Sequence, residues 1–150
     1  MNVLNEVRVE FFSISANEAF ARSLCACFAA QLDPTLEELG DLRTAVSEAV
    51  TNAIVHGYPN TIGRVFLRLR RLEDNVLEVQ IKDKGVGIAD VVRAREPLYT
   101  TGGEERSGMG FTIMESFMDS IKVNSTPGRG TTVTLRKKIS RRMKHERPNP

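Results

Sequence analysis

The chain has 150 residues, of which 27% are charged, and its formal net charge at pH 7 is +2. This length is enough for one hydrophobic core but not for two, and the near balance of charge gives no general nucleic-acid-binding signature. The sequence has no apolar run long enough to cross a membrane and no signal peptide. We therefore expect a cytoplasmic protein with neither nucleic acid nor a membrane as a direct partner.

The first half of the chain predicts one strand followed by two helices. Residues 7–12 alternate apolar and polar side chains, which is typical of a strand, and we expect it at an edge of the sheet. Ser15, with Glu18 three residues later, predicts a capping box for a helix that ends near residue 32. Asp33 and Pro34 then predict the start of a second helix, which we expect to run to residue 57.

The two cysteines, Cys25 and Cys27, both fall in the first of these helices. Residues two apart in a helix point to different faces, so this spacing suits neither a zinc site nor a disulfide within the helix. We expect two ordinary thiols in a reducing compartment.

The second half of the chain predicts four strands with helices between them. Strands at 64–72 and 76–83 are expected to form a hairpin across residues 73–75. The remaining expected elements are, in chain order, a glycine-bearing loop, a short helix near 90–94, a polar stretch at 95–107, a helix at 108–120 and strands at 121–125 and 131–139. Together they predict an α+β fold, a two-layer α/β sandwich whose mixed, mostly antiparallel sheet has helices on one face.

Residues 1–139 are therefore expected to form one domain, followed by a basic tail at 140–150. Basic side chains concentrate between residues 136 and 147. Such a run could bind nucleic acid or an anionic surface. We favour a solvated tail, because that is the commoner outcome and because Pro148 and Pro150 close the chain.

The first of three chemical motifs lies in the second helix. Glu48, Asn52 and His56 recur every four residues in an otherwise apolar segment, so they line one face of the predicted helix. A carboxylate and an amide on a helix that faces a core are costly unless something polar meets them. Their oxygen atoms suit Mg²⁺, which water and nucleotide phosphates usually complete. The alternative is a helix whose polar seam faces solvent.

The second motif follows the strand at 76–83. Asp83 ends that strand, and Gly85 and Gly87 come directly after it. Glycines at this spacing let the backbone turn sharply and approach a ligand closely. A carboxylate at this point could accept a hydrogen bond from the exocyclic amine of adenine. The alternative is an ordinary Asp-Gly loop.

The third motif opens the apolar helix expected at 108–120. Gly108 and Gly110 stand at its start, preceded by Arg106 and Ser107. Glycines at a helix N-terminus expose N–H groups to an anion, and the helix dipole adds to the attraction. Each motif is weak evidence by itself, but the three in this order, with strands and helices between them, strongly indicate a nucleotide site.

These segments resemble the GHKL ATPases, whose nucleotide site is the Bergerat fold, and within them the small anti-sigma serine kinases of endospore-forming bacteria. The resemblance covers about residues 5–139. It is carried by SEAVTNAIVHG at 47–57, ERSGMGFTIME at 105–115, NEAFAR at 17–22 and AQLDPT at 30–35.

The resemblance implies a role for each motif residue. Asn52 would hold Mg²⁺ through its side-chain oxygen, and Glu48 would act as the general base toward the attacking hydroxyl. Asp83 would bind the adenine amine, with Thr131 beside the base. Gly85 and Gly87 would keep the base pocket open.

The phosphates are expected to lie near the start of the third motif. Gly108 and Gly110, with their neighbours Ser107 and Met109, would surround them with N–H groups. Arg106 would add positive charge at the γ-phosphate, which makes it a second catalytic candidate. Thr100 and Thr101 would belong to a lid over the nucleotide.

The resemblance also implies partners. It predicts a homodimer that binds and inhibits the sporulation sigma factor sigma-F and phosphorylates a serine on an anti-anti-sigma protein, with ATP or ADP controlling the choice of partner. Arg22 matches a family position for partner contact. Neither histidine precedes Glu48, so a phosphoacceptor ahead of the ATPase motifs is not expected. The alternatives are another target, such as the stress sigma factor sigma-B, or a nucleotide-gated binding module without kinase activity, which Glu48 argues against.

Overall fold

Five strands form one sheet in the computed structural model of the chain, which describes residues 1–96 and 110–140. The strands are β1 (Val3–Phe12), β2 (Arg64–Leu72), β3 (Val76–Asp83), β4 (Ser120–Thr126) and β5 (Gly130–Lys138). Their order across the sheet is β1-β2-β3-β5-β4, and every pairing is antiparallel in the described residues. The expected edge position of β1 is confirmed, and the sheet expected to be mixed is antiparallel throughout this part of the chain.

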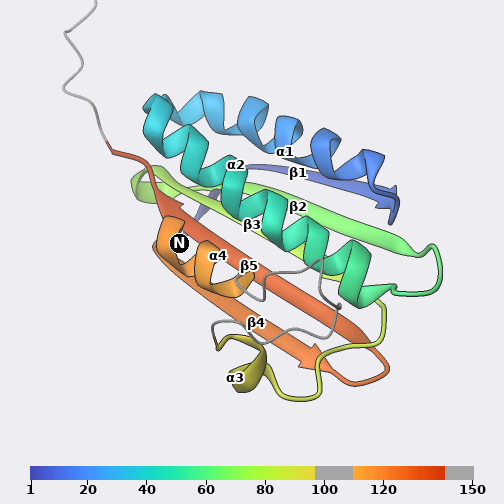
Figure 1. Cartoon of the computed structure of the whole chain (residues 1–150). Coiled ribbons are helices and arrows are strands. Elements are labelled where there is room, and N and C mark those ends of the chain that lie inside the picture. The colour runs from blue at the N-terminus through green and yellow to red at the C-terminus, as the bar shows by residue number, and fades with distance from the viewer. Residues whose placement is uncertain (97–109, 141–150) are drawn as a thin grey trace, which may run out of the picture.

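The longer helices pack on one face of this sheet, and one short helix lies beside β4 (Figure 1). The helical elements are α1 (Ala16–Ala29), η1 (Ala30–Leu32), α2 (Leu36–Thr51), η2 (Asn52–Gly57), the short α3 (Val91–Ala94) and α4 (Gly110–Phe117), while η3 (Glu73–Asn75) is the turn between β2 and β3. α2 lies between α1 and α4 and packs against both. This two-layer arrangement confirms the predicted α+β sandwich.

The core fills the space between the two layers. Alternate residues of β2 (Val65, Leu67 and Leu69) point toward the helices and are buried, as the strand period requires. From the helices they meet residues such as Val46 and Val50 of α2. Burial of this apolar face holds α2 against the sheet, and α2 carries the first motif.

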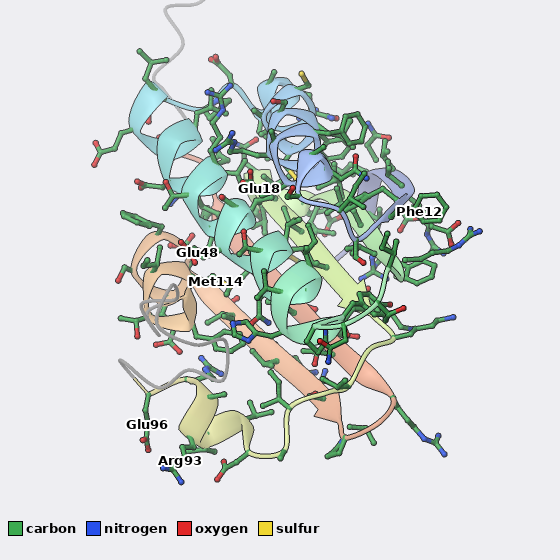
Figure 2. All side chains as sticks on the ribbon, turned by 45° about the vertical axis from the view of Figure 1, so that its right-hand side comes forward. Phe12, Glu18, Glu48, Arg93, Glu96 and Met114 are labelled. Atoms are coloured by element: carbon green, nitrogen blue, oxygen red, sulfur yellow. The ribbon has the colours of Figure 1, made fainter. Side chains whose placement is uncertain are left out.

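The start of α1 differs from the predicted capping box. The side chain of Ser15 makes no capping hydrogen bond. Glu18 instead points toward α2, where its carboxylate accepts a hydrogen bond from the hydroxyl of Ser47 (Figure 2). The predicted capping box is wrong because the Glu18 carboxylate, which would have accepted from the N–H of Ser15, instead accepts from Ser47, a residue distant in sequence.

The capping box lies at α2, two residues after the predicted start. Thr35 is the N-cap, its Oγ1 accepts from the N–H of Glu38 at 3.0 Å, and the Glu38 carboxylate accepts from the N–H of Thr35 at 2.9 Å. Asp33 has a left-handed backbone with φ of 53°, so Asp33 and Pro34 belong to the turn before the helix rather than to its first turn.

The predicted long helix changes its winding at Asn52. Residues Asn52–Gly57 form a π-helix, η2, which is rare and often found at functional sites. Its i→i+5 hydrogen bonds widen the turn, while the helical segment still ends at Gly57, as predicted. Glu48 and Asn52 still share a face, since the N–H of Asn52 donates to the carbonyl of Glu48. The alignment of His56 with them stays a prediction.

The sheet face opposite the helices is charged. Glu78 on β3 is only 3% exposed and pairs with Arg68 at 3.1 Å, Arg70 at 3.9 Å and Arg136 at 2.8 Å. A groove of about 540 Å³ crosses this face. It is lined by Arg8, Val9, Glu10, Phe66, Leu67, Arg68, Gln80, Lys82 and Lys84.

The two thiols lie on different faces of α1, as predicted. Cys25 is buried, and this burial raises the pKa of its thiol to about 12, whereas Cys27 is exposed. No helix in the described ranges is both long and apolar enough to span a bilayer.

Candidate functional site

One end of the candidate site lies between α2 and α4. Glu48 is half-buried on α2, and a Cβ added to Gly110 would lie 3.3 Å from its Oε2. Figure 2 shows Glu48 on the side of α2 that faces α4. Gly110 is the first residue of α4, where N–H groups are not used within the helix. The structure therefore places a carboxylate beside a helix N-terminus that favours anions.

The other end of the site lies where η2 meets β3. A Cβ on Gly57 would lie 2.7 Å from Cγ of Asp83, so only a glycine allows the end of η2 to approach this carboxylate. Asn52, the first residue of η2, is half-buried. In the sequence it lies between Glu48 and Gly57. One helical segment thus joins the two predicted ends of a nucleotide site.

Asp83 is a buried carboxylate, with 3% of its surface exposed. Burial raises its pKa, although the N–H groups of Gly85 and Thr131, which donate to the carboxylate, oppose that shift. The hydrogen bond from Gly85 N to Oδ1 is 2.9 Å long. A carboxylate held by two backbone donors keeps further acceptor capacity for an amine.

The two glycines after Asp83 are required by close backbone packing. A Cβ on Gly85 would lie 1.8 Å from the carbonyl oxygen of Gly57, and a Cβ on Gly87 would lie 2.3 Å from that of Thr126. Gly87 also has a φ of +75°. We expected these glycines to keep a base pocket open, but their first effect is to let this loop press against η2 and the β4–β5 turn.

Thr131 lies opposite Asp83 in the β3–β5 pairing and is buried. Its Oγ1 is 2.8 Å from Oγ of Ser125, and the preceding Gly130 has a φ of +118° that brings it against the backbone of Asp83. Asp83, predicted to bind the adenine amine, and Thr131, predicted beside the base, are therefore brought together.

Several predicted site residues lie outside the described ranges. They are Thr100, Thr101, Arg106, Ser107, Gly108 and Met109. Conversely, the three motifs assign no role to Gly57, Tyr58, Ser125 or Gly130, which all contact the Asp83 end. Each makes at least one contact with a residue distant in sequence, which no periodic pattern reveals.

Arg22, the predicted partner contact, lies on α1 away from these residues. Its side chain is 43% exposed, and its Nη1 is 3.7 Å from Oε1 of Glu18. The same Glu18 oxygen accepts from Ser47, the neighbour of Glu48 in the chain. Arg22 is thus available at the surface while its ion-pair partner contacts α2.

The described residues fit Mg²⁺ only together with a nucleotide. Within residues 1–96 and 110–140, His, Cys, Asp and Glu nowhere gather in threes as a metal site would need. Glu48 and Asn52 supply one carboxylate and one amide oxygen on the same helix face. Mg²⁺ is commonly held by such a small protein set when phosphates and water complete its coordination.

Comparison with known proteins identifies relatives over almost the whole chain. The family model described as a histidine kinase-like ATPase domain matches residues 14–137. The anti-sigma F factor of Bacillus subtilis (strain 168) is 54% identical over 139 residues, covering 91% of this chain and 94% of that protein. The anti-sigma F factor of Caldanaerobacter subterraneus subsp. tengcongensis is 53% identical over 142 residues, covering 94% of this chain and 99% of that protein.

A solved structure agrees with the fold. The RsbU and RsbW domains of a Mycobacterium tuberculosis protein match with a TM-score of 0.66 at 19% identity, covering 91% of this chain and 32% of that chain. At this identity the match supports the fold alone. With the relatives above, it confirms the resemblance and the fold class predicted from the three motifs.

Proposed function

Because the chain belongs to the histidine kinase-like ATPase family, with anti-sigma F factors among its relatives, we propose that it is an anti-sigma factor and a protein serine kinase. Residues 1–139 form its ATP-binding kinase domain. It binds and inhibits sigma-F, and it phosphorylates a serine on an anti-anti-sigma protein. The observation that carries the kinase assignment is the Glu48 carboxylate beside Gly110, at the start of α4.

The proposed site has an end that binds adenine and an end that binds the phosphates. Asp83 accepts a hydrogen bond from the adenine amine, with Thr131 beside it. Asn52 offers its side-chain oxygen to Mg²⁺. Gly110 belongs to the N–H groups that bind the phosphates, and the predicted residues between 100 and 109 complete that end. ATP supplies the phosphoryl group when it is bound.

Glu48 supplies the acid–base chemistry. It would take the proton from the serine hydroxyl of the partner as that oxygen bonds to the γ-phosphorus of ATP and ADP leaves. A nucleotide-gated binding module without catalysis does not need a carboxylate at the phosphate end of the site. This position favours a kinase over a binding module without catalysis.

Arg22 supports the proposal of a protein partner. Its guanidinium is exposed on α1 and meets Glu18, which also contacts the hydroxyl of Ser47. An acidic side chain of sigma-F or of the anti-anti-sigma protein could pair with Arg22. Arg22→Glu is expected to weaken partner binding at least tenfold while ATP affinity stays within twofold, since Arg22 lies outside the nucleotide site.

We also propose a homodimer, with the charged sheet face as its contact surface. That face carries both signs of charge around its groove, so a second copy could place acidic groups against basic ones. Lys82→Glu, an exposed change in the groove, is expected to raise the dimer dissociation constant in sedimentation experiments. A wild-type chain that stays monomeric at all concentrations would contradict the dimer.

The central experiment measures both partners with both nucleotides. A nucleotide can change partner choice only through different contacts in its two states, here with or without the γ-phosphate. ATP is expected to favour the sigma-bound dimer, and ADP to retain the unphosphorylated anti-anti-sigma protein, with a coupling of about 1–3 kcal/mol. Identical partner affinities with ATP and with ADP would contradict nucleotide control of partner choice. Absence of phosphoserine on the anti-anti-sigma protein would contradict the kinase activity, and tighter binding to sigma-B than to sigma-F would identify a different target.

A further inference from the structure

Two side-chain hydroxyls hold the loop at residues 84–88, which follows Asp83. The N–H of Lys84 donates to the hydroxyl oxygen of Tyr58 at 2.7 Å. At the other end of the loop, the N–H of Ile88 donates to Oγ of Ser125 at 2.7 Å. Tyr58 follows η2 and Ser125 lies on β4, so the two hydroxyls hold the loop from different elements.

Tyr58 is itself fixed on two sides. Its hydroxyl donates to the carbonyl of Arg64 at 2.7 Å, at the start of β2. Its ring lies against Gly63, where a Cβ would come within 2.2 Å of Cε1. The hydroxyl that accepts from the N–H of Lys84 therefore has little freedom to move. Tyr58 also directly follows Gly57, which lies against the Asp83 carboxylate.

Ser125 connects the far end of the loop to Thr131. Its Oγ is 3.1 Å from the carbonyl oxygen of Gly130 and 2.8 Å from Oγ1 of Thr131. The N–H of Thr131 in turn donates to Asp83. Polar contacts therefore run from Ile88 through Ser125 and Thr131 to the same carboxylate that Tyr58 approaches from the other side.

Backbone contacts hold the middle of the loop. The N–H of Val86 donates to the carbonyl of Gly57 at 2.9 Å, and the carbonyl of Val86 accepts from the N–H of Gly128 at 2.7 Å. The loop is thus pressed between η2 and the β4–β5 turn, and the two hydroxyls close its ends.

We propose that Tyr58 and Ser125 are positioning residues that set the base selectivity of the nucleotide site. A carboxylate discriminates an amine donor from a carbonyl acceptor only if its own position is fixed. Tyr58 and Ser125 hold the strand end and the loop that fix Asp83, without contacting the base. This inference rests on the proposed ATP site.

The test uses the full chain with Tyr58→Phe and Ser125→Ala, and calorimetry with ADP and with GDP. Each variant loses one hydroxyl and leaves a backbone N–H without its partner. ADP affinity is expected to fall about tenfold, and GDP affinity less than twofold, so the ADP-to-GDP preference shrinks. Ser125→Ala removes a single oxygen from a strand and keeps the test valid if Tyr58→Phe does not fold.

Val46→Ala is the matched control, because Val46 is buried on α2 away from the loop. It is expected to lower thermal stability and to leave the ADP-to-GDP preference unchanged. The inference is overturned if both hydroxyl variants keep the wild-type preference, or if Val46→Ala changes the preference as much as they do. A wild-type chain that binds neither nucleotide would instead overturn the proposed ATP site, and this inference with it.

Discussion

The carboxylate of Glu48 faces the first residue of α4, with Oε2 3.3 Å from the point where a Cβ of Gly110 would lie. Two helices that follow different parts of the sheet therefore meet at one polar point. A side chain at residue 110 would crowd the carboxylate. The same contact positions Glu48 at the end of the site where phosphates are proposed to bind.

Glu48→Gln tests the general base. Glutamine keeps the size of the side chain and its ability to hydrogen bond, but it does not accept the serine proton. Phosphotransfer to the anti-anti-sigma serine is expected to fall by roughly 10²–10⁴-fold, while ATP affinity stays within a few-fold. Single-turnover transfer measured with bound ATP separates the two effects. Transfer at the wild-type rate would exclude Glu48 as the base.

Asn52→Ala tests the metal contact. The variant loses the side-chain oxygen that is proposed to bind Mg²⁺, so ATP binding in the presence of Mg²⁺ is expected to weaken strongly. Without Mg²⁺, variant and wild type are expected to bind ATP similarly. Calorimetry with magnesium and with a chelator checks this. An equal loss under both conditions would point to a direct contact with nucleotide rather than with metal.

Asp83→Asn tests recognition of adenine. The change replaces one acceptor oxygen with a donor amide at a carboxylate that receives the N–H groups of Gly85 and Thr131. ATP binding is expected to weaken by roughly 1–3 kcal/mol, with a smaller change for GTP. Competition between the two nucleotides on one sample gives the comparison. If both nucleotides lose affinity equally, Asp83 does not recognise the base.

The raised pKa of Asp83 also predicts a pH effect on the nucleotide-free protein. Because burial raises this pKa in the folded state, the folded chain holds the proton more tightly than the unfolded chain. The stability from this group is therefore present below the ordinary aspartate pKa and is lost as pH rises through the folded-state value. Urea denaturation across that window is expected to show this loss in wild type and not in Asp83→Asn.

Substitutions at the two candidate helix caps are expected to differ in their effect on the free energy of unfolding. Thr35→Ala removes a side chain that accepts from the N–H of Glu38, and it is expected to cost about 0.5–2 kcal/mol of unfolding free energy. Ser15→Ala is the matched control, since the Ser15 side chain makes no capping hydrogen bond. Its cost is expected to be near zero. Equal losses in urea denaturation would contradict the position of the cap.

Local patterns predicted most of the fold. The bounds of β2 and β3 agree with the prediction, and the turn across Glu73–Asn75 uses positive φ at Asp74 and Asn75, which short polar residues tolerate. These features depend on residues close in sequence. The change to a π-helix at Asn52 escaped prediction because one widened turn leaves the apolar pattern of the helix almost unchanged.

The sequence predicts the candidate site residues, but it does not predict the residues that hold them in position. Glu48, Asn52, Asp83 and Thr131 stand in recognisable motifs. The hydroxyl of Tyr58 accepts a hydrogen bond from the N–H of Lys84, 26 residues away in the sequence. The hydroxyl of Ser125 accepts one from the N–H of Ile88, 37 residues away. Such contacts depend on how the layers pack, so a sequence pattern does not indicate them.

The last described strand ends beside the beginning of α2. The Glu38 carboxylate accepts from the N–H of Ser140 at 2.8 Å, and the side chain of Asn75 donates to the carbonyl of Ile139 at 2.9 Å. Glu38 precedes Glu48 by ten residues of helix, a rise of about 15 Å. A tether attached directly after Ser140 would therefore start well away from the nucleotide end, which suits the chain to surface immobilisation for measuring partner binding.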